Sequence, residues 1–130
     1  MAGSFTDYLE DKILKHVFTN TAYTSPTTVY VGLFTAAPTD TGGGTEVSGS
    51  GYARKSASFT VSGTGTLATN SAAIEFDAAT GSWGTIVAIA VFDDLTTGNM
   101  LAWADLTTSK SIATGDVLRI PAGDLDITLS

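Results

Sequence analysis

The chain has 130 residues, and 43 % of them are apolar, which is enough for one core and predicts a single domain over residues 1–130. Six basic residues stand against 13 acidic ones, and the resulting net charge of -7 argues against a nucleic-acid surface, which needs a basic stripe. There is no cysteine, so disulfides and thiolate metal sites are excluded.

The first predicted element is an amphipathic α-helix over about residues 5–19. Ser4 is the expected N-cap, and an apolar residue recurs every fourth position from Phe5 to Val17. Acidic side chains come in the early turns and basic ones in the later turns, which is the order that the helix dipole favours. Because such a helix has one apolar side, we expect that side to be covered.

From about residue 27 onward the sequence predicts about eight strands and no further helix. Apolar runs bounded by Gly, Pro and Asp recur at intervals of roughly 8–12 residues, which is typical of an antiparallel β-sandwich. We therefore predict a mainly β, jelly-roll-like sandwich preceded by one helix. The most apolar strand, residues 84–93, is expected to be central and covered on both faces. Its two predicted faces are Val87/Ile89/Val91 and Ile86/Ala88/Ala90/Phe92.

A glycine-rich segment over residues 36–50 is predicted to be a flexible surface loop. It contains Asp40 and the run Gly42, Gly43, Gly44. This run is no phosphate-binding loop, because the Lys and Ser/Thr that follow such glycines are missing and no helix starts there.

Catalytic and metal-binding patterns are weak in this sequence. The single histidine, His16, lies on the predicted helix, where a surface role is the simpler interpretation. Glu75 and Asp77 would share one side of a strand and could form a carboxylate pair, but acidic residues at strand ends are ordinary turn formers. We therefore expect no enzyme activity, no cofactor and no metal site.

Two further features bear on binding. Trp83 stands in a Gly-Ser-Trp-Gly turn and is predicted to be the more exposed tryptophan, which makes it the candidate for a sugar-binding platform, whereas Trp103 is predicted to be core. Arg54 and Lys55 form the one basic pair, which could anchor a salt bridge across an interface.

Several strings of the sequence, in order and over nearly the whole chain, resemble a family of small tailed-bacteriophage virion proteins, described as tail-fibre-like or capsid-decorating. This resemblance implies a structural protein without a catalytic role. The strings are LEDKILKHVF (9–18), VYVGLFTAAP (29–38), GYARK (51–55), GSWG (81–84), VFD (91–93), GDVLRIPAG (115–123) and LDITL (125–129).

The resemblance leaves the place on the virion open, and we favour a capsid decoration (cement) protein on the outer shell. A complete receptor-binding fibre has an attachment segment, a repetitive shaft and a tip, and this chain has room for one of them and no repeat. A small tail-associated or tail-fibre protein is the alternative, and a carbohydrate-binding module is a distant one.

The expected partners are the major capsid protein, or tail proteins, and further copies of the chain in a homotrimer. Neither nucleic acid nor a membrane is expected, since no apolar stretch reaches the roughly 18 residues that span a bilayer. The first residues lack the features of a signal peptide, so we expect synthesis in the bacterial host cytoplasm and a final place on the virion exterior. The expected contacts come from residues 2–8, the loop 35–51 and the turn 81–84. The individual interface candidates are Phe5, Tyr8, Asp40, Gly42, Gly43, Gly44, Arg54 and Trp83.

Overall fold

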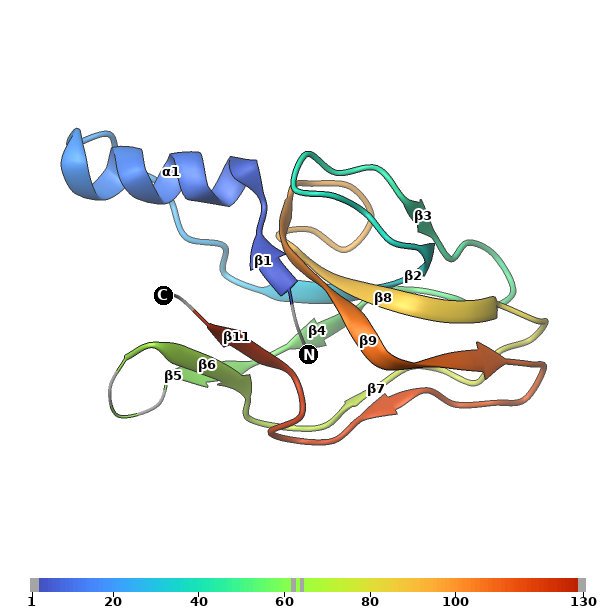
Figure 1. Ribbon diagram of the computed structural model, residues 1–130. Coiled ribbons are helices and arrows are strands. Elements are labelled where there is room, and N and C mark those ends of the chain that lie inside the picture. The colour runs from blue at the N-terminus through green and yellow to red at the C-terminus, as the bar shows by residue number, and fades with distance from the viewer. Residues whose placement is uncertain (1–2, 62, 64, 129–130) are drawn as a thin grey trace.

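In the part of the chain that the structure describes, one short strand and one helix are followed by strands alone. The structure is a computed structural model that describes residues 3–61, 63 and 65–128 (Figure 1). Its elements are β1 (Gly3–Phe5), α1 (Asp7–Phe18), β2 (Val29–Ala36), β3 (Thr45–Glu46), β4 (Lys55–Ala57), β5 (Phe59–Val61), β6 (Leu67–Asn70), β7 (Ile74–Glu75), β8 (Gly84–Phe92), β9 (Met100–Ile112), β10 (Arg119–Ile120) and β11 (Asp126–Thr128).

The strands form one large antiparallel sheet and two small ones. The large sheet has the order β1-β9-β8-β2-β3, and β4 also pairs with β2. The small sheets are β11-β6-β5 and β10-β7, and Figure 1 shows both on the same side of the large sheet. The predicted mainly β fold, with antiparallel sheets in a sandwich-like arrangement and one helix near the N-terminus, is confirmed.

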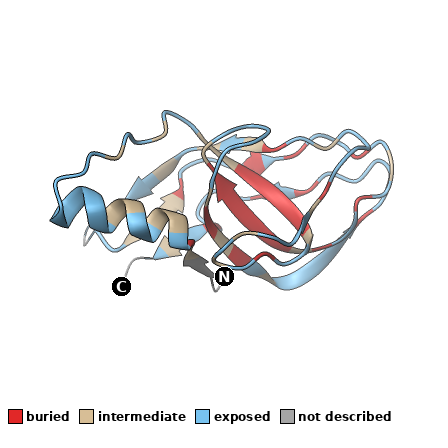
Figure 2. Ribbon diagram, turned by 90° about the horizontal axis from the view of Figure 1, so that it is seen from above, coloured by how far each residue is buried: buried red, intermediate tan, exposed pale blue. Residues whose placement is uncertain are grey.

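The main core lies between the large sheet and the small sheets. β2 and β8 contribute Val31, Leu33 and Ile89, and Phe76 faces them from the segment after β7. A second, smaller cluster lies on the opposite, outer side of the large sheet and is made by Phe34, Ala88, Ala90 and Phe92. The prediction that the strand around residues 84–93 is covered on both faces is therefore confirmed (Figure 2).

The predicted face assignment of β8 is wrong at its first residues. Ile86 packs in the main core with Ile89 and Val91, whereas Val87 packs on the outer side. The register of the β8–β9 pairing shifts between Ile86 and Ala88. A β-bulge of this kind inserts one residue and exchanges the faces of the residues beyond it.

The helix begins later than predicted and has a different cap. Residues 3–5 pair with β9 as an edge strand, in the register Phe5↔Ala102. The N-cap is Thr6 rather than Ser4, and its hydroxyl oxygen accepts a hydrogen bond from the backbone N–H of Leu9. Residues 3–5 form a strand instead of the first turn of the helix because pairing with β9 supplies hydrogen-bond partners for their backbone N–H and C=O groups.

The expectation that the apolar side of the helix is covered holds within the described chain for the first turns of α1 and is wrong for its last turns. No residue of α1 is buried, and of its side chains Tyr8 and Leu9 are the apolar ones that pack against the main core. Leu14, Val17 and Phe18 are 57 %, 61 % and 77 % exposed. Figure 1 shows the helix projecting beyond the sheets, and Figure 2 shows its far end exposed.

Candidate interaction surfaces

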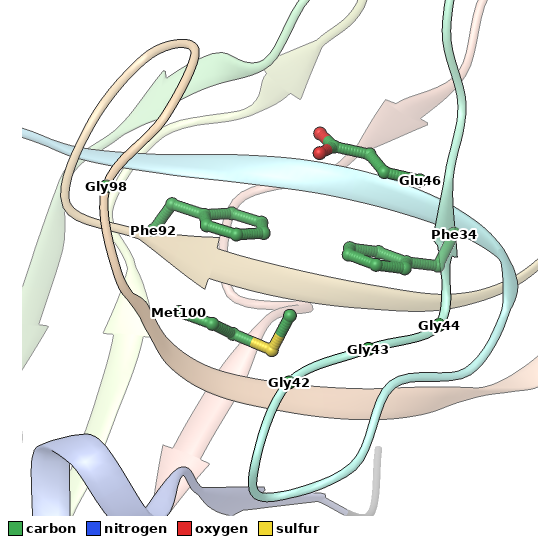
Figure 3. A pocket seen from close by; sticks show the side chains of 8 residues that line it. All are labelled: Phe34, Gly42, Gly43, Gly44, Glu46, Phe92, Gly98 and Met100. Atoms are coloured by element: carbon green, nitrogen blue, oxygen red, sulfur yellow. The ribbon is translucent and has the colours of Figure 1, made fainter.

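An open pocket lies on the outer side of the large sheet, where four strands and two loops meet (Figure 3). Its volume is about 340 Å³. We call it the outer pocket. It is lined by Phe34 of β2, Glu46 of β3, Phe92 of β8, Met100 of β9, the glycines 42–44 and Gly98.

The floor of the outer pocket is apolar. The rings of Phe34 and Phe92 lie nearly parallel, with 6.1 Å between their centroids and 8° between their planes. Between them on β8 stand Ala88 and Ala90, both fully buried. Because these alanine side chains are small, the two rings can lie along the sheet above them. Met100 packs beside the rings.

An ion pair between buried Arg54 and partly exposed Glu46 supports one wall of the pocket. Arg54 Nε and Nη2 donate to the two carboxylate oxygens of Glu46, at 2.9 and 2.8 Å. The guanidinium of Arg54 also lies 3.5 Å from the centroid of the Phe92 ring. The Tyr52 hydroxyl donates to Glu46 Oε2 at 2.6 Å. Burial, and then this hydrogen bond, raise the pKa of Tyr52 well above its usual range.

Arg54 further fixes the loop between β8 and β9. Its Nη1 donates to the carbonyl oxygens of Asp94 and Thr97, at 3.0 and 2.8 Å. The same loop requires glycine at position 98, where φ is +81° and an added Cβ would collide with the Asp93 carboxylate and Asp94. The pocket therefore has a wall held by charge-assisted hydrogen bonds rather than a free loop.

The glycine run forms the opposite wall. All three residues have positive φ, at +100°, +81° and +74° for Gly42, Gly43 and Gly44. A Cβ at Gly44 would lie 2.6 Å from the carbonyl oxygen of Ala36, whereas one at Gly42 or Gly43 meets nothing within 4 Å. The first two glycines thus leave open space, while the third is required by close packing of the backbone.

Asp40 joins this wall to the helix and to β9. Its carbonyl oxygen accepts from the backbone N–H of Asp7, the first residue of α1, at 2.9 Å. Its carboxylate accepts from the indole N–H of Trp103 at 2.9 Å. Within the predicted surface loop, Asp40 thus makes two tertiary hydrogen bonds, and Thr39 and Gly42 form an isolated β-bridge.

The structure brings together five of the eight predicted interface residues. Gly42, Gly43 and Gly44 line the outer pocket, Arg54 pairs with its lining residue Glu46, and Asp40 lies in the loop that carries the three glycines. Phe5 and Tyr8 are half-buried at the base of the helix, where Phe5 pairs with β9 and Tyr8 packs on the main core. Of the predicted N-terminal contact segment, Ala2 lies outside the described residues.

Two of the predicted interface residues do not have the surface role expected of them. Trp83 is 5 % exposed, its indole N–H donates to the carbonyl oxygen of Ser50, and its ring stands edge-on to Tyr52. Arg54 is likewise buried, and its salt bridge is internal to the domain. The prediction that Trp83 is the more exposed tryptophan and Trp103 the buried one is therefore wrong, because Trp103 is the partly exposed one.

Sequence reasoning missed the apolar floor of the pocket and the exposed end of the helix. Phe34, Phe92 and Met100 looked like ordinary strand residues, and their gathering depends on strand pairing. The sequence signal for this apolar floor was the strand 84–93, because both of its faces are apolar and the second face therefore needed apolar residues to cover it. For the helix, the signal was Phe18, which extends the apolar side to the last turn.

The candidate carboxylate pair and the single histidine interact with other groups of the domain. Asp77 pairs with Lys55 at 2.9 Å, and Glu75 lies 3.7 Å from Arg119. His16 Nδ1 accepts from the backbone N–H of Tyr23 at 3.0 Å. Among the residues that the structure describes, no group of three or more His, Asp or Glu side chains is placed to hold a metal ion. Within the same part of the chain, no helix has the length and apolarity needed to cross a membrane.

These features define a mainly β, antiparallel domain with a projecting helix and an open apolar pocket. Residues 4–128 match the family model described as "Podophage GP4 fiber I protein gp80", and the chain belongs to this family. It is a bacteriophage virion structural protein of a tail-fibre-like family, which confirms the resemblance inferred from the sequence. The match fits the tail alternative better than capsid decoration, which is not confirmed. No curated protein matches the sequence.

Proposed function

We propose that this chain is a structural subunit of a podophage tail fibre, placed on the exterior of the virion. The observation that carries the proposal is the family match, which spans residues 4–128 and whose description names a fibre protein. This replaces capsid decoration as the favoured role. On this proposal the chain has no catalytic function.

The proposed role relies on contact surfaces. The domain offers the outer pocket, whose walls are held by Arg54 and Asp40, and the exposed end of α1. A small subunit with modest contacts attaches firmly when several copies bind at once, because linked contacts raise the effective concentration. The structure thus supplies the surfaces that a repeated fibre component requires.

A carbohydrate-binding function has lost its main support. The candidate platform, Trp83, is buried and hydrogen-bonded, so its ring has no free side on which a sugar could stack. We therefore offer no second function.

The test is the position of the chain on the intact particle. Antibodies raised against the purified domain are applied to virions and imaged by electron microscopy, and its copy number is measured by quantitative mass spectrometry. We expect label confined to the tail and at most a few dozen copies. Label spread over the head, with hundreds of copies, contradicts the proposal and restores capsid decoration.

A further inference from the structure

The chain reverses its direction directly after α1. The backbone N–H groups of Thr19 and Thr21 both donate to the carbonyl oxygen of Lys15, at 3.1 Å each. Asn20, between them, has a φ of +59°, a left-handed conformation that asparagine tolerates. The residues after the helix therefore fold back against its own last turn, and Figure 1 shows the chain returning from there toward β2.

The hydrogen bonds of this returning segment are local. The backbone N–H of Tyr23 donates to His16 Nδ1 at 3.0 Å. Among the described residues, those from 19 to 23 form their hydrogen bonds with one another or with the last turns of α1, and none with a sheet. We call residues 13–23, which comprise the last turns of α1 and this segment, the helix-end unit.

Tyr23 is a side chain of this unit with an unsatisfied polar group. Its ring is half-buried and its hydroxyl oxygen is buried, yet the hydroxyl has no hydrogen-bond partner in the described part of the chain. Burial, and then the charges of Tyr8 and Asp93, raise the pKa of Tyr23. These two neighbours belong to the first turn of α1 and to the loop after β8, so Tyr23 packs against the folded domain.

The packed position of Tyr23 is marginally stable. Burial of the ring favours it, whereas a buried hydroxyl without a hydrogen bond has lost its water and gained no partner. Leu14, Val17 and Phe18 of the same unit are more than half exposed and add little burial. Segments that change conformation in proteins come from such regions of low local stability.

We propose that the helix-end unit opens as one piece while the sheets stay folded, and that the unsatisfied hydroxyl of Tyr23 keeps its closed position marginal. Opening breaks the bond between Tyr23 and His16 and returns the hydroxyl to water. The base of the helix stays in place, since Thr6 is 2 % exposed and its hydroxyl group donates to the carbonyl oxygen of Met100 at 2.6 Å. The proposal holds for any place of the chain on the virion, so it stands or fails separately from the proposed function.

Amide hydrogen exchange, resolved by residue, tests the role of the hydroxyl. Tyr23→Phe keeps the ring and removes the unsatisfied group. We expect the amides of residues 13–18 to exchange at least about fivefold more slowly, the factor that corresponds to the lower bound for one unsatisfied buried group. Tyr23→Ala also removes the ring, and it should speed the same amides by at least about tenfold. Tyr30→Phe, at a half-buried tyrosine of β2, is the matched control and leaves them unchanged.

The same experiment shows whether the unit opens as one piece. The amides of the helix respond to a change at Tyr23 only when the opening that exposes them also undocks Tyr23. His16→Phe keeps a ring of similar helix propensity and removes the acceptor of the Tyr23 N–H. It should speed exchange at Tyr23 and at residues 13–18 alike, by at least about twofold, as loss of one hydrogen bond does.

Three results overturn the proposal. The first is wild-type exchange of residues 13–18 in Tyr23→Phe, which means that the helix end frays without Tyr23. The second is faster exchange in that variant, which means that the hydroxyl stabilises the closed position. The third is a His16→Phe variant in which the amide of Tyr23 alone responds.

Discussion

At the residue scale, the most constrained point of the domain is the packing around Glu46. Arg54 and Tyr52 from one segment of the chain and Gly32 from β2 converge on this one carboxylate. A paired charge with its hydrogen bonds satisfied is tolerated in a buried place, while removal of one partner leaves the other uncompensated. This cluster therefore fixes the relative positions of β2, β3 and the loop after β8.

Gly32 gives the first prediction. A Cβ at this position would lie 2.7 Å from Glu46 Oε2 and 3.1 Å from both Phe92 and Tyr52. Gly32→Ala is therefore expected to lower the free energy of unfolding by about 1–3 kcal/mol through overpacking. Urea denaturation measures the change. Gly63→Ala is the control, because a Cβ there meets nothing within 4 Å. Equal effects of the two substitutions would show that Gly32 is not sterically required.

Tyr52 gives a prediction about pH. Its pKa is raised in the folded domain, by burial first and by the hydrogen bond with Glu46 second. The unfolded chain loses the phenol proton at about pH 10, whereas the folded domain keeps it. The contribution of Tyr52 to stability is thus complete below that pH, and it falls by about 1.4 kcal/mol per unit above it. Denaturation curves at alkaline pH test this, and Tyr52→Phe should show a shallower loss. An identical alkaline loss in both proteins contradicts the assignment.

At the element scale, the helix is held by its first turn. Thr6 is 2 % exposed, and its hydroxyl group donates to the carbonyl oxygen of Met100 at 2.6 Å while accepting from the N–H of Leu9. The adjacent bond between Asp7 and Asp40 adds a second attachment. The rest of α1 has no buried residue. The direction of the helix is therefore set at one end.

The cap gives the third prediction. Thr6→Ala removes a capping oxygen and leaves a buried carbonyl oxygen without its donor, so we expect a loss of about 1–2 kcal/mol in the free energy of unfolding. Thermal denaturation measures it. Thr19→Ala serves as the control, since the Thr19 hydroxyl bonds an exposed carbonyl oxygen at the other helix end and should matter less. A larger effect at Thr19 would mean that the far end, and not the base, holds the helix.

The large sheet was only partly predictable at this scale. The apolar strand around residues 84–93 and the one between Pro26 and Pro38 are evident from β-branched and aromatic runs. The bulge that exchanges Ile86 and Val87 is not, because it depends on how β9 pairs with β8. The same holds for β1, which exists because β9 offers it an edge.

At the scale of the whole molecule, stability is unevenly distributed. β2, β8 and β9 contribute most of the buried apolar residues, while the far half of α1 contributes none. Local opening is easiest where few apolar contacts are lost. The far half of α1 is therefore expected to be the least stable part of the described fold, because a short helix without tertiary packing is marginal by itself.

Hydrogen exchange tests this distribution and gives the fourth prediction. In the isolated domain, amides of residues 13–18 should exchange at least about a hundredfold faster than those of β8, because opening the helix end costs little. Equally slow exchange of residues 13–18 and of β8 would show that the domain stabilises the whole helix.

The composition and the order of apolar runs determined the class of this protein: mainly β and acidic, with a helix near the start and the motifs of a phage virion family. These properties follow from local periodicity and from residue types, which the sequence displays directly. The tertiary structure decided which residues are in contact. Trp83 was drawn into the core by Tyr52 and Ser50, and Phe34, Phe92 and Met100 gathered into one pocket, because strand register couples residues far apart in the chain.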